Sequence, residues 1–173
     1  MTMPRELLIL RHAKSSWDSD AATDFERPLA KRGRKAAPRV GRWLDQQGLT
    51  PDYVVSSPAE RAKQTVLAVC EQLGFPPEEI NWDSRIYGGG TTSLVSVLRE
   101  SPADAGRVLI AGHNPGLEIL VQYLCDDTIP FPPDGKLMPT AAVAHLKLEC
   151  DWENLGRGTA QFQSLTRARS LLD

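Results

Sequence analysis

The chain has few cysteines, no long hydrophobic run and little excess charge. Its three cysteines, Cys70, Cys125 and Cys150, lie far apart and lack the spacing of a zinc site or a redox motif, so we expect reduced and mostly buried thiols. Residues 1–6 precede only four apolar residues, too few for a signal sequence or a membrane-spanning helix, which favours a cytoplasmic protein. A net charge of −2 gives no overall attraction to nucleic acid or to an anionic membrane.

The composition is that of an ordinary folded protein. Hydrophobic residues make up 41% of the chain and charged residues 24%. No linker or low-complexity tract divides the 173 residues, so we expect residues 1–173 to form a single domain.

Short apolar runs alternate with helix-like segments along the chain. The predicted elements are buried strands at 7–10, 53–55 and 108–111, helices at 29–47, 57–73, 94–99 and 117–125, and antiparallel edge strands at 142–148 and 159–165. Pro38 lies inside the first helix and predicts a kink or a later start. This order of elements predicts an α/β fold with a single open, mostly parallel sheet and helices on both faces.

Three predicted strands end at side chains that bind phosphate. The first strand runs into Arg11 and His12, the second continues through five residues to Arg61, and the third continues through Gly112 to His113. The ligand crevice of an open parallel sheet lies beyond the carboxyl ends of its strands, so we expect one shared cationic site. Phosphoryl transfer depends mainly on positioning and charge stabilisation, which such a site can supply.

Two helices are predicted to start beside this site. Ser57 begins a capping-box pattern, with Pro58 at the first helical position and Glu60 returning a bond to the cap. Asn114 is the predicted cap of a later helix that Pro115 opens. Free N–H groups at both helix starts would face the same anion.

These motifs together resemble the histidine phosphatase superfamily. Three segments match its motifs in order: LRHAKS at 10–15, SSPAERAKQT at 56–65 and GHNP at 112–115. The short length is similar to that of its bacterial phosphohistidine phosphatase branch. The resemblance implies a phosphoglycerate-mutase-like fold without a cap domain, and it implies that no metal or other cofactor is needed.

The resemblance also implies roles for individual residues. His12 would be the nucleophile that is transiently phosphorylated, and Arg11, Arg61 and His113 would form the phosphate pocket. Guanidinium groups disfavour a second positive charge on a nearby imidazole, so they would also keep His12 unprotonated and nucleophilic.

Four further polar residues are candidates for substrate binding or for a structural role. Lys14 and Ser15 follow the nucleophile and, with Asn114, are candidate substrate-binding residues. His145 lies in an alternating strand away from the motifs and is interpreted as a surface or packing residue. The three histidines lack the local spacing of a metal site, so we predict no metal ligands.

The general acid departs from the family pattern. Mutase-like relatives carry glutamate where this chain has Ser84, and other relatives carry aspartate where it has Asn114. Asp83 is a possible substitute, one position away. Candidate acids in the loop after the first strand are Asp18, Asp20 and Asp24. A phosphoramidate releases a better leaving group than a phosphate ester does, so a weak or missing acid favours P–N cleavage.

A basic stretch at residues 27–42 bears on the partner. It holds seven Lys or Arg residues and no acidic residue. It is either a surface that steers an acidic phosphoprotein or an ordinary solvated helix face. No aromatic platform accompanies it, so we do not expect a nucleic-acid partner.

The sequence therefore predicts a metal-independent phosphatase with a phosphohistidine intermediate. The predicted substrate is phosphohistidine on another protein, with phosphate as product and no membrane or nucleic-acid partner. Two alternatives stay open, namely a phosphomonoesterase for a small metabolite or phosphoester, and a non-catalytic phosphate-binding module.

Overall fold

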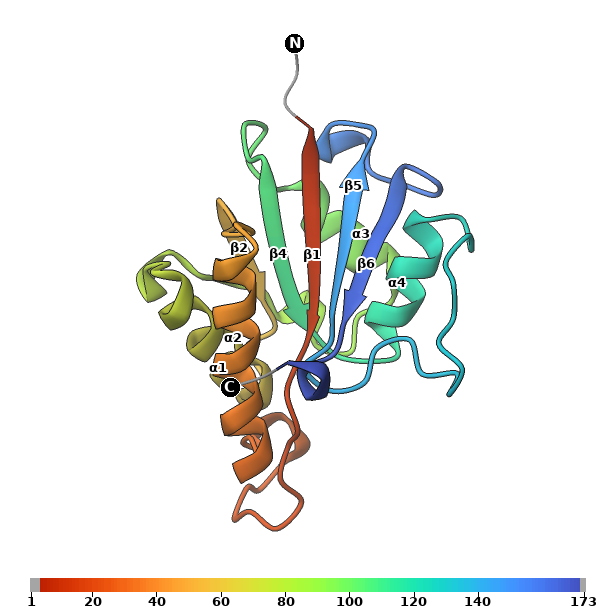
Figure 1. Ribbon diagram of the computed structural model, residues 1–173. Coiled ribbons are helices and arrows are strands. Elements are labelled where there is room, and N and C mark those ends of the chain that lie inside the picture. Colours follow the sequence, from red (N-terminus) through yellow and green to blue (C-terminus); the bar gives the residue numbers. More distant parts are fainter. Residues whose placement is uncertain (1–3, 172–173) are drawn as a thin grey trace.

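A six-stranded sheet forms the centre of the computed structural model, which describes residues 4–171 (Figure 1). Its strands are β1 (Arg5–Arg11), β2 (Tyr53–Ser56), β3 (Asn81–Trp82), β4 (Arg107–Gly112), β5 (Val143–Leu148) and β6 (Ala160–Thr166). They lie in the order β3-β2-β4-β1-β5-β6, with β5 antiparallel to both of its neighbours and the other pairs parallel. The predicted α/β fold with an open, mostly parallel sheet is confirmed.

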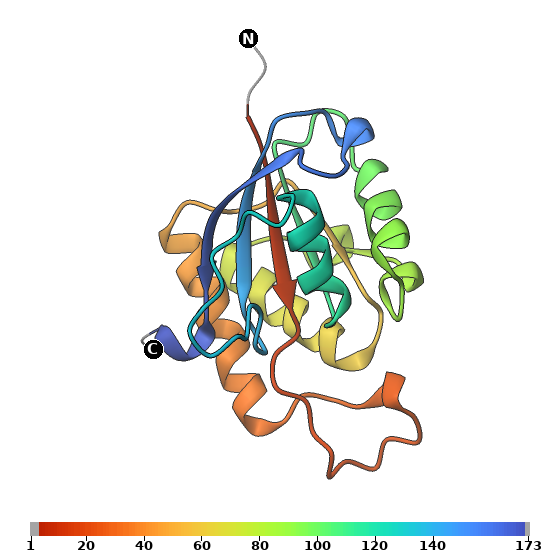
Figure 2. The ribbon, with the colours of Figure 1, turned by 90° about the vertical axis from the view of Figure 1, so that its right-hand side faces the viewer.

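Helices cover both faces of this sheet: α1 (Lys31–Gln46), α2 (Glu60–Leu73), α3 (Thr91–Arg99) and α4 (Gly116–Leu124). Successive side chains of a strand point to opposite faces. In β1, Leu8 and Leu10 therefore join the core under α1 and α2, whereas Leu7 and Ile9 join the core under α3 and α4. Figure 2 shows α1 and α3 on opposite sides of the sheet. Burial on both faces explains why β1 is a continuous apolar run.

The helix α1 passes through Pro38 and does not start there, so of the two predicted outcomes the late start is wrong, and a kink at Pro38 stays a prediction. Its inner face buries Ala37, Val40 and Leu44. Gly41 allows α1 to approach α2 closely, because an added Cβ would lie 2.7 Å from the carbonyl oxygen of Val69. This burial stabilises the helix despite the N–H group that proline lacks.

Both predicted side-chain caps are wrong. The helix α2 begins at Glu60 with Ala59 in the cap position, and α4 begins at Gly116 with Pro115 in that position. Neither helix start has a side-chain cap hydrogen bond. Ser57 and Asn114 lie outside the helices, where their side chains bind other groups near the strand ends. In contrast, Gly74 ends α2 in a left-handed conformation with a φ of 71°, directly after the predicted last residue at position 73.

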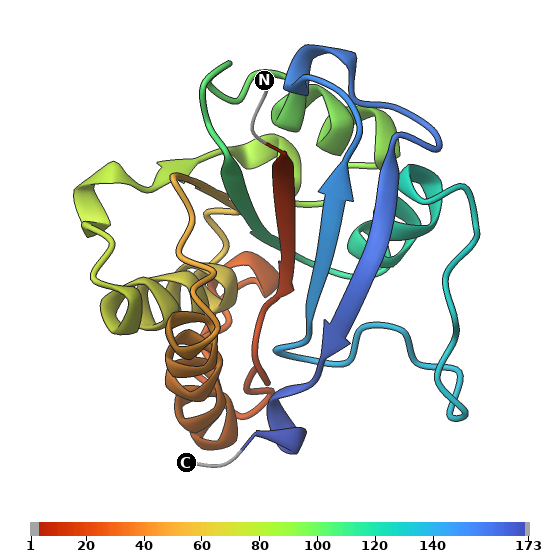
Figure 3. The ribbon, with the colours of Figure 1, turned by 45° about the horizontal axis from the view of Figure 1, so that its top comes forward.

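The 3₁₀ turn η5 (Ala168–Ser170) brings the end of the described chain back to α1 (Figure 3). Cys70 and Cys125 are buried free thiols and Cys150 is a partly buried one, as expected. His145 is neither a free surface residue nor a core residue, since its Nε2 lies 2.5 Å from a Glu6 carboxylate oxygen. Across residues 4–171, no helix has the length and apolar character needed to cross a bilayer.

Candidate active site

The adjacent strands β1 and β4 carry the two predicted site histidines at their carboxyl ends. Arg11 pairs with Gly112 in the parallel register, so His12 and His113 follow at the same level. The His12 N–H donates to the Gly112 carbonyl at 3.0 Å, and the two imidazole ring centroids are 5.2 Å apart. The sheet topology therefore places both rings at one edge.

Main-chain contact fixes the ring of His12. Its Nδ1 donates to the Ala13 carbonyl at 2.7 Å. A carbonyl oxygen only accepts, so the neutral ring carries its hydrogen on Nδ1 and its lone pair on Nε2. Burial, helped by the nearby Arg61 and Arg11 guanidinium groups, lowers the pKa of His12 from 6.5 to about 4, and the hydrogen bond that His12 donates to the Ala13 carbonyl opposes this shift. The imidazole is therefore uncharged at neutral pH.

Arg61 reaches the same place from the first turn of α2 and is only 7% exposed. Its two terminal nitrogens donate to Asp24, one to the main-chain carbonyl at 2.7 Å and one to the carboxylate at 3.0 Å. Arg11 donates to the Met138 carbonyl at 3.0 Å. Burial lowers the Arg11 pKa, opposed by Glu118 and assisted by the positive charge of Arg61. Two guanidinium groups thus flank His12.

His113 is held by a serine that follows β2. Its Nε2 lies 2.8 Å from the Ser57 hydroxyl oxygen, and that oxygen also accepts from the Ala59 N–H. Burial lowers the pKa of His113 to about 3, together with the positive charge of Arg61 and the repulsion that a protonated His12 would add. Ser57, predicted as a helix cap, therefore positions a site imidazole instead.

Three buried polar atoms at this edge have no hydrogen-bond partner among the residues that the structure describes. They are Arg11 Nε, His113 Nδ1 and Asn114 Oδ1. The amide nitrogen of Asn114 does have a partner, because it donates to the Met138 carbonyl at 2.7 Å. Unpaired buried polar atoms are costly, and their gathering at one edge is typical of a site that binds a polar ligand.

The candidate acids lie in different surroundings. Asp83 accepts three hydrogen bonds from Arg85, which hold its pKa below the usual range. Asp24 accepts from Arg27 and Tyr87, as well as from Arg61, and its pKa falls to about 2 for those reasons. Of the two, only Asp24 contacts Arg61 of the cationic site, and both carboxyl groups are ionised at neutral pH.

The other predicted residues of the loop lie less centrally. The Ser15 hydroxyl accepts from Arg27 at 2.6 Å, so it contacts a neighbouring cation. Lys14 is exposed beside Arg11. Asp18 and Asp20 are exposed. The loop therefore contributes Asp24 to the site and several more distant polar side chains.

The sequence analysis missed two groups at this edge. The Tyr87 hydroxyl donates to Asp24 at 2.9 Å, and the edge of its ring packs against His113 with centroids 5.5 Å apart. Tyr87 lies three residues after Ser84, where the sequence analysis considered only the missing glutamate, so the segment itself had already been singled out. The carbonyl of Met138 binds both Arg11 and Asn114, and no side-chain pattern reveals such a main-chain group.

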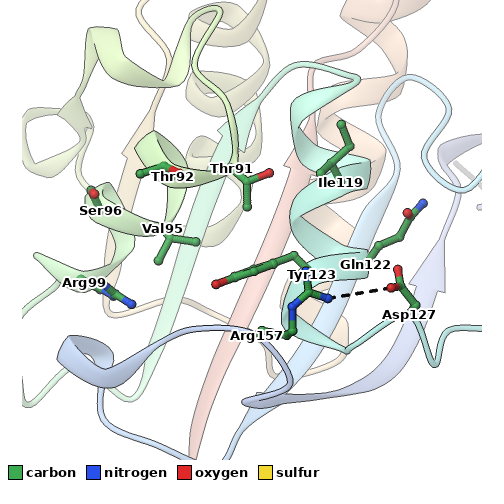
Figure 4. A pocket seen from close by; sticks show the side chains of 10 residues that line it. All are labelled: Thr91, Thr92, Val95, Ser96, Arg99, Ile119, Gln122, Tyr123, Asp127 and Arg157. Atoms are coloured by element: carbon green, nitrogen blue, oxygen red, sulfur yellow. Dashed lines mark ion pairs between the residues drawn. The ribbon is translucent and has the colours of Figure 1, made fainter.

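Two pockets differ in their relation to this site. A groove of ≈ 840 Å³ is lined by Arg11, Lys14 and Asn114, among others. A pocket of ≈ 420 Å³ lies between α3 and α4, where Arg157 pairs with Asp127 next to Tyr123 (Figure 4). The second pocket is lined by none of the site residues Arg11, His12, Arg61 and His113. Within residues 4–171, no three His, Cys, Asp or Glu side chains gather as a metal site.

Comparisons with known proteins agree with this arrangement. The family profile of the histidine phosphatase superfamily (branch 1) matches residues 7–84. The phosphohistidine phosphatase SixA of Escherichia coli is 29% identical over 160 residues, covering 91% of this chain and 92% of that protein. A solved structure of a SixA protein from Nakamurella multipartitia is 28% identical with a TM-score of 0.81, covering 95% of this chain and 96% of the other.

A chloroplastic protein of Arabidopsis thaliana, described as uncharacterized, is also similar. It is 31% identical over 136 residues, which are 74% of this chain. The same match covers 62% of the plant protein, so the chain spans less than two thirds of that relative's length.

Proposed function

This chain belongs to the histidine phosphatase superfamily, and we propose that it is a metal-independent phosphatase for phosphohistidine on proteins. The observation that carries the proposal is the neutral His12 imidazole between two guanidinium groups. The Escherichia coli relative is a phosphohistidine phosphatase, which supports the same substrate class here.

His12 is the proposed nucleophile. Its Nδ1 is occupied by the Ala13 carbonyl, which leaves the lone pair of Nε2 for attack on phosphorus. In the first displacement the Nε2–P bond forms and the P–N bond of the substrate breaks, and the departing imidazole takes its proton from water. In the second, water attacks phosphorus and releases orthophosphate, which returns Nε2 to its starting state.

Arg11 and Arg61 supply the positive charge that the transferring phosphoryl group requires. Each planar guanidinium can hold two oxygens of the group, and their charge stabilises the negative oxygens of the transition state. In the tautomer in which the Ser57 hydroxyl donates to His113 Nε2, the hydrogen of His113 lies on the partnerless Nδ1 and is free to donate to a phosphoryl oxygen. Lys14, Ser15 and Asn114 complete the proposed substrate-binding set.

The ionisation of the carboxylates supports P–N cleavage over ester cleavage. An alkoxide leaving group needs a proton donor in the transition state. Asp24 has a pKa of about 2, and the pKa of Asp83 is lowered by its bonds from Arg85, so neither holds a proton at neutral pH. We therefore propose that hydrolysis proceeds without a carboxylic acid as proton donor, so Asp83 does not serve as the acid.

Labelling in the transient state tests the proposal. Wild-type protein is mixed with a protein substrate that carries radiolabelled phosphohistidine, and the reaction is stopped in alkali, where phosphohistidine is stable. We expect label on the wild-type enzyme that acid removes, and none on His12→Ala. The control His145→Ala also removes a histidine, one that contacts Glu6 away from the site, and should label normally.

A comparison of substrates tests the leaving-group preference. Wild-type turnover of a phosphoramidate should exceed that of an alkyl phosphate by at least about a hundredfold, the lower range of general acid catalysis. Equal turnover of both would instead favour a phosphomonoesterase. Phosphate binding without label or turnover would favour a binding module.

A further inference from the structure

The groove beside the candidate active site is strongly basic. It is continuous with the site because Arg11, Lys14 and Asn114 line it. Three separate segments contribute further cations to its walls, namely α1, the segment before β5 and the turn η5. These cations are Arg32, Arg39, Lys136, Arg167 and Arg169.

Negative charge in the groove is small and already engaged. Glu118 is the single carboxylate among the lining residues, and its Oε1 accepts from the Met138 N–H at 2.8 Å. Arg167 and Arg169 are both paired with Asp134, at 2.8 Å and 3.5 Å. In the described part of the chain, Lys14, Arg32 and Lys136 have no carboxylate within ion-pair distance. A chain with a net charge of −2 has thus gathered unpaired cations along one groove.

We propose that this groove binds an acidic segment of the substrate protein next to its phosphohistidine. The inference rests on the proposed function, because the site must hold the phosphoryl group while the groove holds the flank. Carboxylates on that flank would meet the unpaired cations, which gives both faster encounter and choice of partner.

The dimensions of the groove favour a peptide over a compact anion. Arg32 and Arg39 are seven residues apart on α1, or about 10.5 Å along the helix axis. That span equals about three residues of an extended chain. The volume of ≈ 840 Å³ is also far more than one phosphoryl group fills. Cations spread over several segments suit carboxylates that are spread along a polypeptide.

Charge reversal at two exposed groove residues tests the inference. The double variant Arg32→Glu with Lys136→Glu is compared with Lys35→Glu plus Lys147→Glu, whose side chains are exposed and lie outside the groove. Both pairs change the net charge equally, so long-range effects are matched. Substrates are two phosphohistidine peptides, one flanked by Asp and Glu and one flanked by Lys.

We expect wild type and the control pair to prefer the acidic peptide by about tenfold in kcat/KM, mostly through KM, with the preference falling as salt rises. The groove pair should lose most of that preference. Turnover of both peptides at equal rates by wild type would overturn the inference and leave the proposed function intact.

A binding measurement keeps the two proposals separate. Unphosphorylated acidic peptide should bind wild type and the control pair more tightly than it binds the groove pair, whether or not any peptide is hydrolysed. Equal binding to all three proteins would overturn the groove assignment. So would inorganic diphosphate that occupies the groove while the acidic peptide does not bind, since that result would indicate a site for a small polyanion.

Discussion

Arg61 donates to Asp24 twice, to its main-chain carbonyl at 2.7 Å and to its carboxylate at 3.0 Å. A phosphoryl group in the proposed site would need the same guanidinium nitrogens. The Asp24 side chain is 51% exposed, so solvent can replace this contact at small cost. The loop carboxylate and the substrate therefore compete for one donor.

Removal of that charge should strengthen phosphate binding. An Asp24→Asn variant keeps the size of the side chain but removes the negative charge that repels an anion near Arg61. We expect inorganic phosphate to bind about fivefold more tightly, equal to about 1 kcal/mol for a surface charge. Calorimetric titration measures the change, and unchanged or weaker binding would contradict the competition.

The same variant decides whether Asp24 is a general acid. With a pKa of about 2, Asp24 has no proton to donate at neutral pH, so kcat for a phosphoramidate should change by less than about threefold. Loss of a general acid would lower kcat by about a hundredfold or more. A fall of that size in steady-state assays would restore Asp24 as the acid.

Ser57→Ala tests the contact that positions His113. It removes the hydroxyl 2.8 Å from Nε2, and we expect kcat/KM to fall about tenfold, the value of one hydrogen bond. Ser56→Ala is the matched control, because Ser56 is equally buried and its hydroxyl donates to the Ser57 carbonyl. Only Ser57→Ala should shift the NMR signals of the His113 ring. Equal losses of activity in both variants would indicate a purely structural effect.

Acid should destabilise the fold through its neutral histidines. In the folded protein the pKa of His12 is about 4, whereas the unfolded chain has the ordinary 6.5. The unfolded state therefore binds more protons between these values, and stability falls as pH decreases through that range. His12 alone should cost about 2 kcal/mol at about pH 5. Urea unfolding of wild type and His12→Asn at neutral and acidic pH should show a smaller loss in the variant.

A glycine in α1 holds the loop that follows the proposed nucleophile. An added Cβ on Gly33 would lie 2.2 Å from the Lys14 carbonyl oxygen, so Gly33→Ala should displace that main chain and cost about 1–3 kcal/mol. Gly156→Ala is the control, since its Cβ would meet no atom closer than 3.8 Å. We expect thermal unfolding to show the loss of stability in Gly33→Ala alone, together with reduced phosphatase activity.

The predicted strands include both central strands with two covered faces and the edge strands β5 and β6. The apolar runs of β1 and β4 are buried on both sides, so composition alone marks them. β3 has only two residues, Asn81 and Trp82, both exposed at the sheet edge, and no apolar run identifies it. Pro38 favoured a late helix start, but burial of its neighbours in α1 outweighs the missing hydrogen bond.

In the candidate site, the order of elements along the chain predicts the positions of side chains that directly follow strands. It does not predict the positions of side chains in loops. Arg11 and His12 follow a strand directly, so topology places them beside His113. Asp24 reaches Arg61 through a loop, and nothing in its spacing separates it from Asp18 or Asp20. Ser57 matched a helix-capping pattern because the same hydroxyl can serve a helix N–H or an imidazole, and only the position of His113 decides between them.

The residues of the site come from different layers of the protein, namely the sheet and the helices on each of its two faces. Arg61 stands on α2, over one core, while His113 precedes α4, over the other, and His12 leaves the strand that separates the two. Unfolding of either helix layer alone would therefore separate the residues of the proposed active site. Loss of activity in denaturant should therefore coincide with the unfolding of whichever layer unfolds first, and with the unfolding of the whole protein only if the two layers unfold together.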